Sequence, residues 1–96
     1  MHIGVLIVKL QFPQCQSLKS KRRILKSLLD RLRVRFKVSV CELDQQDVWQ
    51  LATIGMALIN SDKQHVQKVL SKMLDFIQQN ANEFHLLDHQ QEMIAG

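Results

Sequence analysis

The sequence predicts an α+β fold with the element order β-α-β-β-α-β. Three segments are rich in the apolar and β-branched residues that favour strands, and a weaker fourth lies near the end of the chain. Two longer segments space their apolar residues at helical intervals, and each follows a strand. Only a short polar connection separates the two middle strands, so we expect them to form a hairpin.

The first strand is expected at residues 2–12, HIGVLIVKLQF, and ends at Pro13. Successive side chains of a strand point to opposite faces, and both faces of this strand begin with apolar residues. One face carries Gly4, Leu6, Val8, Leu10 and Phe12, and the other begins with Ile3, Val5 and Ile7. Such a strand is expected in the middle of a sheet.

The first helix is expected to follow Ser17, a residue type that favours the N-cap position. One stripe at helical spacing is apolar and consists of Leu18, Leu25, Leu28, Leu29, Leu32 and Phe36. Another face is basic and consists of Lys19, Arg22, Arg23, Lys26, Arg33 and Lys37. Lys21 falls near the edge of the apolar stripe, so we expect its stem to pack while its amine reaches solvent.

The second half of the chain repeats the order strand, helix, strand. Strands are expected at residues 37–44 and 49–60, and a weaker one at residues 83–89. The segment Ser61-Asp62-Lys63-Gln64 resembles a capping box in which Ser61 caps a helix that ends near Asn80. The last half-dozen residues are expected to fray.

This order of elements is typical of the ferredoxin-like sandwich. We therefore predict a single domain over residues 1–96, with a four-stranded antiparallel sheet in the strand order 4-1-3-2. Both helices are expected on one face of the sheet, joined to the strands by right-handed crossovers.

Positive charge is concentrated in residues 17–37, SLKSKRRILKSLLDRLRVRFK. This segment holds nine of the chain's thirteen Lys and Arg residues and one acid, Asp30, for a local charge of +8. The remaining residues carry four basic and eight acidic side chains, for a charge of −4. Concentrated charge of one sign indicates a surface for an acidic partner.

RNA is the partner that we expect for this basic face. Residues 19–33 span about 21 Å of helix, so several phosphates can meet them. The expected contacts are Lys19, Arg22, Arg23, Lys26 and Arg33. Phe36 belongs to the apolar stripe and the chain has no Tyr, so no exposed aromatic is expected to stack on bases. The alternative is an ordinary solvated face with local ion pairs to Asp30.

Two further surfaces are candidates for binding a partner. Asp47, Trp49 and Gln50 lie where two strands join and form a possible contact corner, unless Trp49 closes the end of the core. On the sheet face without helices, Ile3, Val5 and Ile7 would form an apolar patch suited to a homodimer. The alternative is that Met93 and Ile94 cover this patch.

Other classes of function find little support in the sequence. Cys15 and Cys41 have no neighbouring base or ligand at metal spacing, and no Gly-rich phosphate loop is present. We expect no catalytic residues, no cofactor and no metal. Asp44 and Asp47 lack a third ligand, and His2 and His89 are expected to approach each other only if the chain ends are ordered. No apolar run is long enough for a membrane span. Two cysteines are too few for a disulfide framework, so a reducing cytoplasm is the expected location.

Several short motifs together resemble the YlxP-like family of short bacterial proteins. The motifs are Gly4-Val5-Leu6, Ser17-Leu18-Lys19-x-Lys21-Arg22-Arg23, Leu28-Leu29-Asp30-Arg31-Leu32-Arg33, Arg35-Phe36, Val38-Ser39-Val40 and Asp44-x-Gln46-Asp47-x-Trp49-Gln50. The resemblance implies a ferredoxin-like fold without an established activity, in a genomic setting near transcription and translation factors. This chain departs from the usual pattern at Ser20, Gln45 and Leu51.

The leading hypothesis is therefore a non-enzymatic protein that binds RNA or a ribonucleoprotein through its first helix. The alternative is a homo-oligomeric interaction domain that uses the open sheet face and the Trp49 corner, without nucleic acid.

Overall fold

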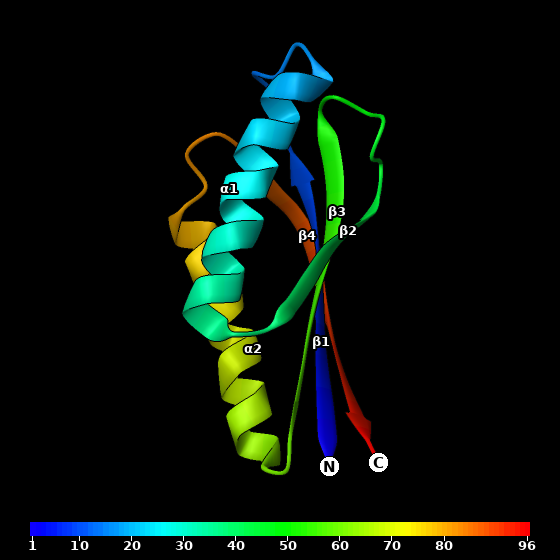
Figure 1. The fold of residues 1–96 in the computed structure, drawn as a ribbon, viewed down its shortest axis with the longest axis vertical. Coiled ribbons are helices and arrows are strands. Elements are labelled where there is room, and N and C mark those ends of the chain that lie inside the picture. Colours follow the sequence, from blue (N-terminus) through cyan, green and yellow to red (C-terminus); the bar gives the residue numbers. More distant parts are fainter.

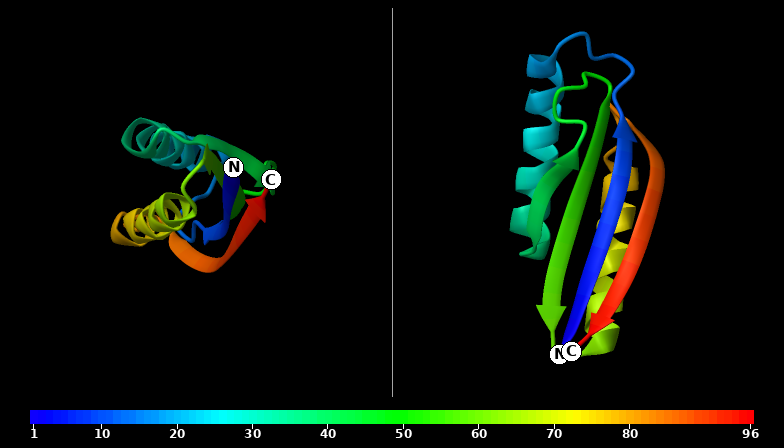
Figure 2. Two further views of the ribbon diagram at one scale, coloured as in Figure 1. Left: turned by 90° about the horizontal axis from the view of Figure 1, so that it is seen from below. Right: turned by 90° about the vertical axis from the view of Figure 1, so that its right-hand side faces the viewer.

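A computed structural model describes residues 1–96 and confirms the expected element order. The strands are β1 (His2–Gln11), β2 (Ser39–Asp44), β3 (Leu51–Asn60) and β4 (His85–Ala95). They form one antiparallel sheet in the order β2-β3-β1-β4, which is the expected order read from its other edge. Helices α1 (Leu18–Phe36) and α2 (Lys63–Gln79) lie side by side on one face of this sheet (Figures 1 and 2). The ferredoxin-like sandwich is thus confirmed.

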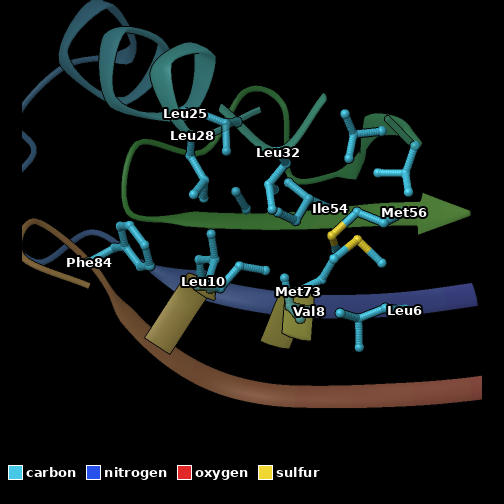
Figure 3. Close-up of a cluster of buried hydrophobic side chains, with 14 of the residues drawn as sticks. Leu6, Val8, Leu10, Leu25, Leu28, Leu32, Ile54, Met56, Met73 and Phe84 are labelled. Atoms are coloured by element: carbon cyan, nitrogen blue, oxygen red, sulfur yellow. The ribbon is translucent and has the colours of Figure 1, made fainter. Parts of the chain in front are cut away.

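The core lies between the helices and the sheet. It is a cluster of 19 buried apolar residues to which both helices and strands β1, β2 and β3 contribute. Figure 3 shows Leu6, Val8 and Leu10 of β1 on the same side of the sheet as the α1 residues Leu25, Leu28 and Leu32. At Gly4, α2 approaches β1 so closely that an added Cβ would clash with Cγ1 of Val66. The two faces of β1 are therefore different, one closely packed and one open.

The helix and strand boundaries shift in places from those expected. Ser17 caps α1 as expected, and its hydroxyl accepts a hydrogen bond from the backbone of Ser20. The cap of α2 is Asp62 rather than Ser61, since the Asp62 carboxylate accepts from the Gln64 amide at 3.0 Å. β2 begins at Ser39 because the chain first closes α1 with a left-handed residue, Lys37 (φ 54°).

The C-terminal strand is longer than expected. β4 extends to Ala95 and pairs with β1 along its whole length, so the last residues do not fray as a free end. His89 pairs with Val8 while His2 pairs with Ala95, so the two histidines lie far apart on the sheet. Met93 packs against the core from within β4, and Ile94 pairs with Ile3. Both residues are part of the sheet, and Ile94 lies on its open face beside Ile3, so it extends the apolar patch instead of covering it.

Candidate nucleic-acid interface

The basic face of α1 is exposed along the helix. All five candidate residues, Lys19, Arg22, Arg23, Lys26 and Arg33, are exposed. Lys19, Arg22 and Lys26 take part in none of the three ion pairs of the molecule. Their charges are therefore directed to solvent.

The other two candidates have intramolecular contacts. Arg23 lies 3.5 Å from the Glu83 carboxylate, and Arg33 lies 3.1 Å from that of Asp30. Arg33 also donates to the Val40 carbonyl of the edge strand β2 at 3.1 Å. Exposed ion pairs of this kind contribute roughly 0–1 kcal/mol, so they are easily exchanged for a phosphate. Arg33 nevertheless has a structural role that its spacing in the sequence did not indicate.

Two more arginines of α1 lie away from this face, beside α2. The guanidinium of Arg35 lies 5.3 Å from the centre of the Phe76 ring and 5.7 Å from that of Phe36. Arg31 lies over the same Phe76 ring and donates to the Asn80 side chain at 3.1 Å. These two charges thus help to hold the helices together.

The position of Lys21 differs most clearly from the one expected. Its side chain does not reach solvent but is fully buried, with 0% of its surface exposed. Its ammonium donates to three carbonyl oxygens, two in the β2–β3 connection and one at the start of β3: Gln45 at 2.6 Å, Val48 at 2.6 Å and Leu51 at 2.9 Å. An ammonium has three protons, so these bonds use its whole donor capacity.

The positive charge of Lys21 is balanced by Glu42 of β2. Oε2 of Glu42 lies 3.3 Å from the Lys21 ammonium, yet this buried oxygen accepts no hydrogen bond. Both observations fit one geometry, because the three protons of the ammonium already point at carbonyls. Glu42 therefore supplies charge compensation rather than a directed bond, and Lys21 acts as the anchor of the β2–β3 connection.

This connection carries the expected contact corner. Asp47, Trp49 and Gln50 are exposed, and the Trp49 side chain keeps 51% of its surface in solvent. The indole therefore does not close the end of the core, and β3 starts only after it, at Leu51. Together with Val48, these three residues line a hollow of about 430 Å³. The expectation that no aromatic is exposed for stacking was wrong.

The open sheet face carries the expected apolar patch. Ile3, Val5 and Ile7 are half-buried there, and Ile59, paired with Ile3, is 60% exposed. A hollow of about 400 Å³ on the sheet is lined by Val5, Ile7, Ser39, Val40, Cys41, Leu43, Gly55, Met56 and Ala57. Ile3 and Trp49 lie near opposite ends of the sheet, since Ile3 pairs with Ile59 and the Trp49 connection precedes Leu51. The expected partner-binding residues thus form two separate surfaces.

The remaining candidate groups are dispersed. Cys15 is buried and Cys41 is exposed, and neither forms a disulfide. No group of three or more His, Cys, Asp or Glu residues is placed to hold a metal ion. Neither α1 nor α2 has the length and apolar character needed to cross a membrane.

Comparison with known proteins identifies the family. A family model described as "Protein of unknown function (DUF503)" matches residues 3–91. The chain belongs to this family. The chain is 41% identical over 61 residues to the uncharacterized protein YlxP of Bacillus subtilis (strain 168). These residues are 64% of this chain and 66% of that protein. The aligned part thus spans just under two thirds of the relative's length, and the YlxP-like resemblance is confirmed.

Solved structures similar to this DUF503 chain show the same fold. The de novo designed protein Foldit4 has a TM-score of 0.55 at 14% identity, covering 100% of this chain and 99% of the other. A second designed protein, LFR1 1 with ferredoxin fold, has a TM-score of 0.50 at 6% identity, covering 98% and 83%. At such low identity the likeness concerns the fold alone, so function must be argued from the surfaces.

Proposed function

We propose that this DUF503 protein is a single-domain, non-enzymatic cytoplasmic protein that binds RNA or a ribonucleoprotein through the basic face of α1. The contacts are Lys19, Arg22, Arg23, Lys26 and Arg33. One observation carries the proposal: these cations are exposed on one rigid helix, in a segment whose net charge is +8 while the rest of the chain is acidic. The two free cysteines support the cytoplasmic location.

The physical basis is the exchange of counterions for protein cations. Each phosphate neutralised by a Lys or Arg releases condensed counterions, and this release favours binding whatever the base sequence. The acidic surplus elsewhere on the molecule repels phosphates, so it restricts contact to the α1 face. Such contacts position the RNA backbone and do not themselves read bases.

A filter-binding assay with matched charge reversals tests this proposal. The test variant changes Arg22, Arg23 and Lys26 to Glu, and the control changes Lys63, Lys68 and Lys72 of α2 to Glu. All six residues are exposed and helical, so both variants lower the net charge from +4 to −2 and keep good helix formers.

We expect the α1 variant to lose RNA retention and the α2 variant to keep most of it. Circular dichroism verifies that both variants are folded. Equal retention by the two variants would refute a binding role for the α1 face, because bulk charge would then explain the result.

A second candidate function is self-association through the open sheet face. The specific observation that favours it is the exposed apolar surface around Ile3, Val5, Ile7 and Ile59, which no helix covers. Contiguous apolar surface on a small protein commonly marks a partner surface, and two-fold symmetric pairs are the commonest assemblies. The two candidate functions use different faces of the sandwich and are tested separately.

A further inference from the structure

We infer that Trp49 is a stacking platform for an unpaired base, so that the ligand is a single-stranded segment of RNA. This inference rests on the proposed function and names the class of RNA that the basic face takes. In this arrangement the phosphates contact the first turns of α1, and a neighbouring base lies on the indole.

The first support is the exposure of the indole. Trp49 is the only Trp of the chain, and 51% of its surface is free although it is a large apolar side chain. It borders a hollow formed by the connection itself, with Asp47, Val48 and Gln50. An exposed ring of this kind offers its π-face to any base, since stacking does not depend on base identity.

The second support is that the backbone around Trp49 is fixed. The carbonyl of Val48 before it accepts from the Lys21 ammonium at 2.6 Å, and the carbonyl of Gln50 after it accepts from the Phe12 amide at 2.8 Å. One residue further, the carbonyl of Leu51 is also bonded to Lys21, at 2.9 Å. A backbone held at three points around Trp49 has little backbone entropy left to lose on binding.

The third support is the position of the cations. Lys21 lies in α1 between Lys19 and Arg22, two exposed residues without an ion-pair partner. The hydrogen bonds of Lys21 therefore bring the Trp49 connection against the same helical turns that carry the free charges. Figure 1 shows the β2–β3 connection beside the beginning of α1, and Figure 2 shows the same proximity from the side.

The charges around the indole orient the ligand. Asp47 is exposed and lines the same hollow as Trp49, so its charge repels phosphates from the ring. The backbone is accordingly drawn towards α1, and the base towards Trp49. Because the bases of a duplex are stacked inside it, only an unpaired base can use this platform.

The lone tryptophan provides the experiment. Wild-type protein is titrated with a single-stranded 12-nucleotide adenosine RNA and with a blunt-ended, fully paired RNA duplex, while binding and indole emission are followed. The variants are Trp49→Ala, Trp49→Phe and the control Leu87→Ala, which removes an apolar side chain of similar exposure (50%) from β4. Fluorescence anisotropy of labelled RNA gives the affinity of each variant.

We expect the single strand to quench the indole emission as binding saturates. Trp49→Ala should weaken single-strand binding about 5- to 150-fold, Trp49→Phe should weaken it less, and Leu87→Ala should leave it unchanged. Binding of the duplex should be the same in all of them, because it uses phosphate contacts alone.

Two results would overturn the inference. One is unchanged single-strand affinity in Trp49→Ala, and the other is unchanged emission at saturation; either assigns the indole to a different contact, such as a protein partner. If RNA binding still depends on Arg22, Arg23 and Lys26 in that case, the proposed function stands without the stacking platform. If the wild-type protein binds neither RNA, both fail.

Discussion

Lys21 shows how a single residue connects the two most informative parts of the sequence. In the helical pattern it lies at the edge of the apolar stripe, where snorkelling to solvent is the ordinary outcome. Its actual partners are carbonyls 24 to 30 residues away, in the β2–β3 connection and at the first residue of β3. The spacing of side-chain types along the sequence cannot predict such a contact, because every residue has a backbone carbonyl whatever its side chain.

Replacing Lys21 tests its role as an anchor. Lys21→Met keeps the length and the buried stem but leaves three carbonyls without a donor and the charge of Glu42 without a partner. We expect the free energy of unfolding to fall by about 3–5 kcal/mol, as when one member of a buried pair is removed. Urea denaturation measures the change.

Lys19→Met is the matched control for this substitution. It makes the same chemical change at an exposed position of the same helix, where substitutions usually alter stability by less than about 0.5 kcal/mol. A similar small effect for both variants would contradict the anchor role.

At the scale of elements, strand and helix interiors were predicted well and their ends less well. Interiors follow from periodicity, which is local, whereas ends depend on single hydrogen bonds and on partners far along the chain. β4 extends to Ala95 because the first half of β1 offers it a pairing edge, although the polar residues 88–92 of β4 are weak strand formers. The N-cap of α2 lies one residue later than expected, at Asp62 instead of Ser61, because Ser and Asp are both favoured at this position and the sequence alone does not choose between them.

The cap of α2 can be verified by two alanine substitutions. Asp62→Ala removes the carboxylate that accepts from the Gln64 amide, and we expect it to lower the free energy of unfolding by about 1 kcal/mol. Ser61→Ala, one residue earlier, should change it by less than about 0.5 kcal/mol. Thermal denaturation followed by circular dichroism compares the two, and the reverse order of effects would restore Ser61 as the cap.

At the scale of the whole molecule, topology was predictable and the site was predictable only in part. The element order, which is typical of the ferredoxin-like sandwich, predicted the strand order, and the two apolar faces of β1 agreed with its central position. The basic face was visible because its residues are neighbours in the sequence. The contact of Arg33 with β2, and the proximity of Trp49 to α1, depend on how the hairpin folds back on the helix, so they appear only in three dimensions.

Self-association through the open face is tested by one charge placed on it. Ile59→Lys introduces an ammonium at a 60% exposed position of the apolar patch, and Val34→Lys does the same at a 79% exposed position of α1. By light scattering at high concentration we expect a dimer for the wild type and for Val34→Lys, and a monomer for Ile59→Lys, because a dimer would bury the new charge unpaired. A wild-type protein that is strictly monomeric would rule out this assembly.

The salt dependence of RNA binding tests the central claim most directly. The measured quantity is the slope of the logarithm of the binding constant against the logarithm of salt concentration. It is compared among the wild type and two triple variants. The α1 variant changes Arg22, Arg23 and Lys26 to Ala, and the α2 variant changes Lys63, Lys68 and Lys72 to Ala. Three lost contacts to a single strand should make the slope of the α1 variant shallower by about 2, while the α2 variant should run parallel to the wild type. Identical slopes for the two variants would contradict the claim that the basic face of α1 binds the phosphates.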